Sequence, residues 1–357
     1  YYLGNGSTNA AYQKLTQTVE EGTVVTFAKV PARTGYVNQG WSSKKNSEKA
    51  TAKAKCTVNK NITLYAVQKK AVQLTFHRCD GSTWQKTTLA KGSSYSLPGV
   101  RDAEGYTFMG WSTKPMQSVS PQYEAEEKIT VNGNVDLYAV VFNRTTETDL
   151  TEDQLPQVDI YKYKQVIFVG DSRTEFMENV LTGMGESATK NVKFVCSAGK
   201  GLDWFTTTGW AQLYSIVQHD SNSILSKKTA VIFNFGVNDL SKSADYAEYY
   251  NWIAPQLKSK GCELYFMSVN PVNRLMLPNA GRADRSEAAV RSFNQYMKAN
   301  LSSAYTYIDM YSYLKSTGYS FASDHYGTGT VDDGLHYTTR TYKRIFAKCM
   351  DSLRVPA

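Results

Sequence analysis

Two short segments of the chain carry residue types that could act together on an ester bond. Val169-Gly170-Asp171-Ser172-Arg173 follows an apolar run, so Ser172 is expected at the end of a buried strand. Near the C-terminus, Asp333-Gly334-Leu335-His336 places a histidine three residues after an aspartate. A serine hydroxyl needs a nearby base to become nucleophilic, and that base needs an orienting group. We therefore predict Ser172 as nucleophile, His336 as general base and Asp333 as the residue that orients His336.

Acyl transfer also requires hydrogen-bond donors for the negatively charged oxygen of the tetrahedral intermediate. The candidates are the main-chain N–H of Ser172, a glycine of Ser197-Ala198-Gly199-Lys200-Gly201 and the side-chain amide of Asn238. Glycine permits a close approach of the main chain to a substrate. Asn238 follows an apolar strand, where an asparagine also serves as a turn former, and its residue type alone does not choose between the two roles.

The other three histidines have weaker claims to catalysis. His77 lies in an N-terminal repeat, and His219 is expected at a helix end in a structural or solvent-facing position. His325 lies in a loop rich in Ser, Asp and Gly and keeps a claim to the rim of the site.

Competing types of site fit the sequence poorly. Thr174 occupies the last position of what would be a Gly-x-Ser-x-Gly segment, which disfavours an α/β-hydrolase elbow. No Gly-Lys-Ser/Thr follows a glycine-rich loop, and no His, Cys or carboxylate cluster has zinc-ligand spacing. We therefore predict neither a cofactor nor a metal.

Strands and helices are expected to alternate in the C-terminal part of the chain. Apolar runs predict strands at 165–169, 192–196, 230–235, 263–269 and 305–309, and helices are expected at 175–184, 244–260, 284–300 and 339–353. Such alternation predicts a parallel sheet that is covered by helices on both faces. Functional groups gather beyond the carboxyl ends of such strands, where Ser172, Gly201 and Asn238 are expected.

Internal similarity organises the chain before residue 143. Gly35-Tyr36-Val37-Asn38-Gln39-Gly40-Trp41-Ser42 recurs as Gly105-Tyr106-Thr107-Phe108-Met109-Gly110-Trp111-Ser112, and a Leu-Tyr-Ala-Val block at 64–67 recurs at 137–140. We predict two β-rich repeats at residues 1–70 and 71–142. A polar, acidic linker is expected at 143–160, followed by an α/β domain at 161–357.

The repeated blocks resemble the extracellular Listeria–Bacteroides repeat, also called the internalin B-repeat. The resemblance implies small β-grasp-like modules on a bacterial surface protein, with a cell-wall or glycan ligand as one option. Trp41 and Trp111 are candidates for ligand platforms, but repeated aromatic residues of a small domain are more often core residues.

The blocks of the α/β domain resemble the SGNH (GDSL-type) hydrolase family. They are Gly170-Asp171-Ser172, the glycine block at 199–201, Gly236-x-Asn238-Asp239 and Asp333-x-x-His336, and they occur in the order of the family. The resemblance implies a three-layer, flavodoxin-like fold, the three catalytic roles given above, and an oxyanion hole formed by Ser172, Gly201 and Asn238.

Two positions depart from the family pattern. Cys196 stands where the family usually has the Asn that opens the glycine block, so the choice of Gly201 over Gly199 as donor stays open. Arg173 replaces a more frequent apolar residue, and we consider three roles for it: orienting the serine loop, binding an acidic or polyhydroxyl substrate, or forming a surface salt bridge.

Composition places few further limits on the chain. Its 357 residues have a net charge of +8, nearly all of it before residue 143, which is typical of a solvated lysine-rich surface or of a surface that attracts polyanions. No nucleic-acid module and no membrane-spanning run is expected. Because the chain starts with Tyr1, we expect it to be part of a longer precursor. The five cysteines leave open whether Cys56 and Cys79 pair.

Together these features predict a secreted or surface-attached bacterial esterase. Short acyl esters, especially acetyl esters on carbohydrate, are favoured because the domain lacks a long apolar lid and contains aromatic residues such as Trp204 that suit sugar faces. The alternatives are a lysophospholipase or other lipolytic esterase, an O-acetyltransferase, and a non-catalytic adhesin with a hydrolase-like scaffold. Gly199, Arg173 and Trp204 are the predicted substrate-binding residues.

Overall fold

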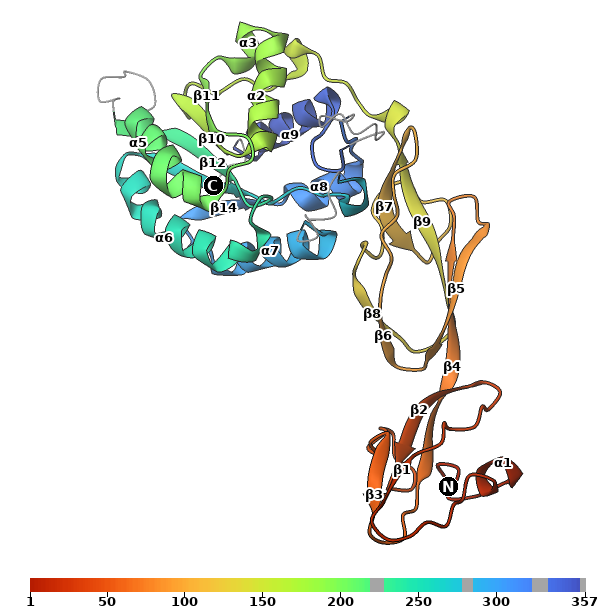
Figure 1. Cartoon of the computed structure of the whole chain (residues 1–357). Helices are drawn as coiled ribbons and strands as arrows, with labels where there is room; N and C mark the ends of the chain where they lie inside the picture. Colours follow the sequence, from red (N-terminus) through yellow and green to blue (C-terminus); the bar gives the residue numbers. More distant parts are fainter. Residues whose placement is uncertain (219–227, 278–284, 323–332, 354–357) are drawn as a thin grey trace. The chain divides into compact units, whose positions relative to one another are not determined.

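The structure is a computed structural model that describes residues 1–218, 228–277, 285–322 and 333–353 (Figure 1). It contains two compact units, one of residues 1–96 and 128–138 and one of residues 97–127 and 139–357. This division runs through the second repeat. Residues 97–127 and 139–142 of that repeat therefore belong to the unit that contains the α/β domain.

The first unit consists of strands, of which β4 is the longest, and one short helix. Antiparallel pairs join β1 to β3, β2 to β4, β4 to β5 and β6 to β8, while β4 pairs in parallel with the start of β9. The elements are α1 (Ala10–Gln13), β1 (Thr23–Thr26), β2 (Tyr36–Ser42), β3 (Lys55–Val58), β4 (Tyr65–His77), β5 (Thr83–Ala90), β6 (Ser93–Ser96), β8 (Lys128–Val131) and β9 (Val135–Asn143).

The two repeated tryptophans are core residues, as the alternative from small-domain packing predicted. Trp41 is 5% exposed and Trp111 is fully buried. Each indole N–H donates to a carbonyl oxygen thirteen residues earlier, Trp41 to Ala28 at 2.6 Å and Trp111 to Pro98 at 2.8 Å. Buried indoles that use their only donor inside the domain are not available as ligand platforms.

A parallel five-stranded sheet forms the centre of the α/β domain. Its strand order is β11-β10-β12-β13-β14, and every neighbouring pair is parallel. The strands are β10 (Gln165–Gly170), β11 (Val192–Cys196), β12 (Thr229–Asn234), β13 (Cys262–Met267) and β14 (Tyr305–Ile308), which confirms the predicted α/β architecture. β10 and β12 are buried throughout, as expected for central strands with helices on both faces.

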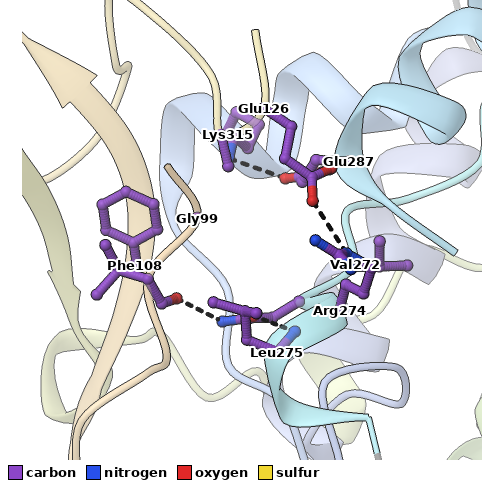
Figure 2. Close-up of a pocket in the computed structure, with 11 residues that line it drawn as sticks. Gly99, Phe108, Glu126, Val272, Arg274, Leu275, Glu287 and Lys315 are labelled. Atoms are coloured by element: carbon purple, nitrogen blue, oxygen red, sulfur yellow. Dashed lines mark hydrogen bonds and ion pairs between the residues drawn. The ribbon is translucent and has the colours of Figure 1, made fainter. Parts of the chain in front are cut away.

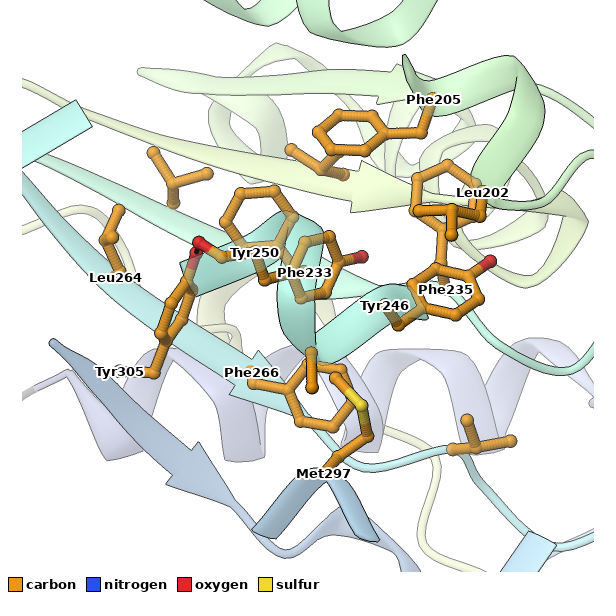
Figure 3. Packing of buried hydrophobic residues seen from close by; sticks show 14 of the residues in the cluster. Leu202, Phe205, Phe233, Phe235, Tyr246, Tyr250, Leu264, Phe266, Met297 and Tyr305 are labelled. Carbon is orange, nitrogen blue, oxygen red and sulfur yellow. Dashed lines mark hydrogen bonds between the residues drawn. The ribbon is translucent and has the colours of Figure 1, made fainter. Parts of the chain in front are cut away.

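Side chains that alternate along the strands separate two hydrophobic clusters, one on each face of the sheet. Ile167 of β10 lies in one cluster with residues of α5 (Trp210–Gln218) and α6 (Ser243–Ser259). Phe168 lies in the other cluster with residues of α2 (Ser172–Met184) and α9 (Thr339–Ser352). Figure 3 shows the first cluster, in which Phe233 and Tyr250 pack with ring centroids 4.7 Å apart. This pattern produces the three layers.

The long helices match the predicted ones in place, with ends that differ by a few residues. The helices α5 and α8 and the short helices α1, α3 and α4 lie outside the four predicted helical ranges. In the second-repeat part of this unit, β7 lies beside β9. The remaining elements are β7 (Tyr106–Ser112), α2 (Ser172–Met184), α3 (Glu186–Thr189), α4 (Leu202–Trp204), α5 (Trp210–Gln218), α6 (Ser243–Ser259), α7 (Glu287–Asn300), α8 (Met310–Thr317) and α9 (Thr339–Ser352).

Residues 143–160, which were predicted as a linker, pack against the α/β domain. Glu147 is buried and accepts hydrogen bonds from Arg344 at 2.9 Å and Ser320 at 2.5 Å. Leu155 and Val158 belong to the hydrophobic cluster that α2 and α9 cover. Although the segment is acidic and polar, its Glu147 is buried and pairs with the buried Arg344.

Two further findings concern the described residues alone. Within those ranges, no helix combines the length and apolar character needed to cross a membrane. All five cysteines are free thiols in the structure, Cys56 and Cys79 included.

Candidate active site

Ser172 lies at the junction of the first strand of the α/β domain and the helix that follows it. β10 ends at Gly170, Asp171 is the N-cap of α2, and Ser172 is the first helical residue. The Asp171 carboxylate accepts the N–H of Arg173 at 3.0 Å, which fixes the start of the helix. Burial raises the pKa of Asp171 to about 6, although the Arg173 guanidinium acts in the opposite direction. As the first residue of α2, Ser172 lies at the positive end of the helix dipole.

His336 bridges Ser172 and Asp333. Its Nε2 lies 2.9 Å from Oγ of Ser172, and its Nδ1 lies 2.6 Å from Oδ2 of Asp333. The other carboxylate oxygen of Asp333 accepts the N–H groups of Leu335 at 2.9 Å and of His336 at 2.7 Å. Asp333 is fully buried and His336 is 4% exposed. The structure thus brings together the three residues for which the sequence predicted catalytic roles.

The turn that carries these residues requires a glycine. Gly334 has φ +66°, and a Cβ at this position would lie 2.3 Å from the carbonyl oxygen of Asn273. On the other side, the ring of Phe176 packs edge-on against the His336 imidazole with centroids 4.5 Å apart. Both contacts restrict the imidazole to an orientation in which it reaches Ser172.

This arrangement can activate a serine. An ionised carboxylate only accepts hydrogen bonds, so Nδ1 carries the proton of the imidazole and Nε2 is left as an acceptor toward the Ser172 hydroxyl. The geometry is that of a hydroxyl nucleophile, a base and an orienting carboxylate.

The predicted oxyanion donors come from three separate loops. In the described part of the chain, the N–H groups of Ser172 and Gly201 donate to no other group. Nδ2 of Asn238 donates one hydrogen to the carbonyl of Lys200 at 2.7 Å, and its second hydrogen remains. Arg285, which sequence reasoning missed, donates to Oδ1 of Asn238 and so determines which way this amide faces.

The glycine block is fixed by the aspartate that follows Asn238. Asp239 accepts the N–H of Leu202 at 3.0 Å and the hydroxyl of Tyr246 at 2.7 Å. A Cβ on Gly201 would lie 2.3 Å from Oδ2 of Asp239, whereas one on Gly199 would meet nothing within 4 Å. Only Gly201 is therefore required to be glycine by a close contact, while Gly199, with φ +70°, forms an exposed turn.

The structure places two of the residues predicted to bind substrate, Arg173 and Trp204, in different surroundings. Arg173 is 3% exposed, and its guanidinium donates to the carbonyl oxygens of Leu335, Asn270 and Pro271 at 2.8–3.0 Å. Among the described residues it pairs with no surface carboxylate, and it orients the serine loop against the His336 turn. Trp204 is partly exposed, and its indole packs on Phe235 at 6.0 Å, at the edge of a core cluster.

Of the remaining histidines, the structure describes only His77, which lies outside this site. His77 has its own partners, the Asp136 carboxylate at 2.8 Å and the Gly81 carbonyl at 3.0 Å. His219 and His325 lie outside the described residues, so their predicted places at a helix end and at the rim of the site stay predictions. No cluster of three or more metal-binding side chains occurs among the described residues.

A parallel sheet with a serine after its first strand, an Asn-Asp pair after its third, and Asp-x-x-His before its last helix defines a hydrolase of the SGNH type. The sequence matches the GDSL-like lipase/acylhydrolase family over residues 166–349, and the chain belongs to this family. Residues 1–67 and 73–140 each match the Listeria-Bacteroides repeat domain. The protein is therefore an ester hydrolase whose catalytic domain follows two such repeats.

Several solved structures align with the chain at low identity. A protein from Bacteroides fragilis assigned as an acylhydrolase is 15% identical, covers 57% of this chain and 92% of its own, and has a TM-score of 0.37. For an acetyl xylan esterase the values are 10%, 53%, 98% and 0.36. For the catalytic domain of peptidoglycan O-acetyltransferase A from Streptococcus pneumoniae they are 16%, 54%, 93% and 0.33. A search of curated proteins gave no match.

Proposed function

We propose that this protein hydrolyses short-chain esters, in particular acetyl esters carried by carbohydrate, through an acyl-serine intermediate. The observation that carries the proposal is the continuous contact from Asp333 through His336 to Ser172, at 2.6 and 2.9 Å. These three side chains are almost entirely buried, and in such surroundings their interactions are stronger than in water.

The mechanism has two steps. In the first, Nε2 of His336 takes the hydroxyl proton as Oγ of Ser172 attacks the ester carbonyl, and the same proton then passes to the departing alkoxide. In the second, water loses a proton to His336 and attacks the acyl-serine, and Ser172 recovers its proton as the carboxylic acid leaves. Asp333 keeps the imidazole in the required tautomer and stabilises the imidazolium that forms in each step.

The tetrahedral intermediate places a negative charge on the former carbonyl oxygen. We assign its stabilisation to the N–H groups of Ser172 and Gly201 and to the second hydrogen of the Asn238 amide. A well-placed donor of this type contributes about 3–4 kcal/mol. The clamp of Asp239 on Leu202 and of Arg285 on Asn238 supports this assignment, because both hold donors in place before substrate binds.

The choice of a short acyl group rests on the sequence. No long apolar segment is present that could cover a fatty chain, and the repeats resemble modules of bacterial surface proteins. We further propose that the protein acts outside the cell or on the cell surface, with the repeats contributing contacts to a glycan or to the cell wall.

Ester turnover by the full chain and by the Ser172→Ala variant tests this proposal. The substitution should lower kcat about 10⁴-fold or more, since it removes the nucleophile and leaves the fold intact. A matched control is Ser303→Ala, which changes an exposed serine. Acetate release from acetylated glycans should also depend on Ser172, whereas unchanged turnover in the variant would falsify the assignment.

Comparison of acyl chains tests the substrate class. Acetyl 4-nitrophenyl ester should be hydrolysed with a higher kcat/KM than the decanoyl ester. A preference for decanoyl would replace the carbohydrate proposal by a lipolytic one. Transfer of acetyl to an added sugar in place of water would identify an acetyltransferase.

A further inference from the structure

Part of the second repeat packs against a loop of the α/β domain within the same compact unit. The repeat segment is 97–127 and the loop is 270–276, which follows β13. Nε of Arg274 lies 3.1 Å from a carboxylate oxygen of Glu126, and Arg101 donates to the carbonyl of Leu275. Figure 2 shows the seam, where Gly99 and Phe108 of the repeat face Leu275 and Arg274. The cavity left between them has a volume of about 20 Å³, room for about one water molecule.

Buried charges reinforce this seam. Lys315 of α8 lies 2.8 Å from the carboxylate of Glu124 and 3.2 Å from that of Glu287. Its main-chain carbonyl also accepts the N–H of Ser120 at 2.9 Å. Lys315 is 5% exposed, so separating the segment from the domain would take away Glu124 and leave the buried ammonium group with one carboxylate, that of Glu287, in place of two.

A comparison of the two repeats shows how the seam is specified. In the first repeat, the carbonyl of Val30 accepts the side-chain amide of Asn38 at 2.7 Å. The corresponding residues of the second repeat are Val100 and Phe108, and Phe108 has no amide to donate. Instead, the amide of Asn273 from the α/β domain donates to the Val100 carbonyl at 3.1 Å. The domain thus provides the donor that the second repeat lacks.

The same amide has a second acceptor in the repeat. Nδ2 of Asn273 lies 2.9 Å from Oδ1 of Asp102, a fully buried carboxylate that also pairs with Arg144 at 2.7 Å and accepts the N–H of Phe108 at 3.0 Å. With both hydrogens of its amide used, Asn273 is held in one rotamer.

The main chain of Asn273 carries this constraint to the His336 turn. Its N–H donates to the carbonyl of Gly334 at 2.8 Å, and its carbonyl oxygen occupies the space that a Cβ of Gly334 would need. Two residues earlier in the same loop, the carbonyl of Pro271 accepts from Arg173 at 2.8 Å and from the hydroxyl of Tyr337. Loop 270–276 therefore contacts the repeat on one side and the residues flanking Ser172 and His336 on the other.

We propose that residues 97–127 of the second repeat brace the His336 turn through Asn273, so that this repeat is required for full catalytic activity. The inference rests on the proposed function, since it assigns Asn273 as a positioning residue for the base of that reaction. Asn273 touches no reacting atom; its effect on catalysis passes through Gly334 and the orientation of the imidazole.

The test compares two asparagines with the same chemistry in different places. In the full chain, Asn273→Ala should lower kcat about 10- to 100-fold with KM little changed, because misplacing a catalytic group by about 1 Å has effects of this size. Asn38→Ala, which removes the equivalent donor from the first repeat, should leave kcat unchanged. Turnover is divided by the concentration of active sites, titrated with an acylating inhibitor, so that loss of folded protein alone does not lower it.

A milder variant covers the case in which Asn273→Ala does not fold. Asp102→Asn keeps the size of the side chain and an acceptor oxygen but removes the charge that faces Asn273 and Arg144, and it should lower kcat per site in the same direction by a smaller factor. Wild-type kcat per site in a folded Asn273→Ala variant, or an equal loss in Asn38→Ala, would overturn the brace.

Hydrogen exchange separates failure of the brace from failure of the proposed function. Exchange at the main-chain amides of residues 333–337 should rise at least about tenfold in Asn273→Ala and stay unchanged in Asn38→Ala, because local opening governs this rate. If the wild-type chain hydrolyses no ester, the proposed function fails, and this exchange result still decides whether the repeat holds the turn. Unchanged exchange in Asn273→Ala would refute the brace whatever the activity.

Discussion

Replacing Asp333 by Asn is a sharp test of the active site, because the structure dictates which way the new amide faces. One carboxylate oxygen of Asp333 accepts the N–H groups of Leu335 and His336, and the other lies 2.6 Å from Nδ1 of His336. The amide oxygen of the variant must take the first position. The opposite orientation would leave two buried N–H groups without an acceptor, at a cost of about 1–3 kcal/mol each.

The amide NH₂ then faces Nδ1 and donates to it, which drives the imidazole proton to Nε2. That nitrogen lies 2.9 Å from Oγ of Ser172 and can no longer accept the hydroxyl proton. Loss of the base through the wrong tautomer lowers kcat by about 10⁴-fold in a Ser-His-Asp site. At about 1.4 kcal/mol for each factor of ten, the barrier should rise by about 5.5 kcal/mol, with little change in KM.

The assay is hydrolysis of 4-nitrophenyl acetate, with kcat expressed per titrated active site. Asp309→Asn is the matched control, since Asp309 also accepts a main-chain N–H, that of Ser312, but lies at the start of α8. Asp333→Ala should retain more activity than Asp333→Asn, because it imposes no tautomer. The reasoning is refuted if folded Asp333→Asn keeps more than about a tenth of the wild-type kcat.

Two further predictions concern stability. Burial raises the pKa of Asp171 from 3.8 to about 6, so between about pH 4 and pH 6 the folded state keeps a proton that the unfolded state releases. The free energy of unfolding should therefore fall by up to about 3 kcal/mol as pH rises through this range, and the Asp171→Asn variant should lack this component. Urea unfolding at pH 4.5 and 7.5 measures the change. Equal changes in the wild type and the variant would contradict the prediction. Glu147→Gln should lower the free energy of unfolding by about 3–5 kcal/mol, because it leaves the Arg344 guanidinium buried without a counter-charge. The control is Asp153→Asn, which changes an exposed residue of the same segment and should have almost no effect on the urea midpoint.

The parts of the site that could be predicted are those whose signals are local. Ser172 stands at the end of a strand that its apolar run reveals, and Asp333 and His336 are close enough in sequence for their pairing to be inferred. Gly201 and Asn238 could be placed in the same way, because each comes shortly after an apolar run that predicts a strand. The parallel sheet was predictable because alternating strands and helices allow few other arrangements.

Residues whose burial depends on distant partners could not be predicted. Arg173 is buried because the carbonyl oxygens of Asn270, Pro271 and Leu335 converge on it, and none of these is close in sequence. Glu147 lies in a segment whose polar, acidic composition is typical of a linker, and its burial depends on the pairing with Arg344. The role of Asn273 carries no motif at all, although the replacement of Asn38 by Phe108 between the two repeats was a signal in the sequence that could have indicated a missing donor.

The hydrophobic cluster shared by the second repeat and the α/β domain has a consequence for biosynthesis. Met109, Val140 and Phe142 lie in the same cluster as Phe168 and Phe346, and Phe142 occupies the space beside Gly318. A ribosome releases these three apolar side chains long before the helices that cover them exist. These apolar side chains therefore remain exposed on the nascent chain until residues as far along as Phe346 have been translated, and a chaperone that binds the nascent chain has to cover residues 109–142 first.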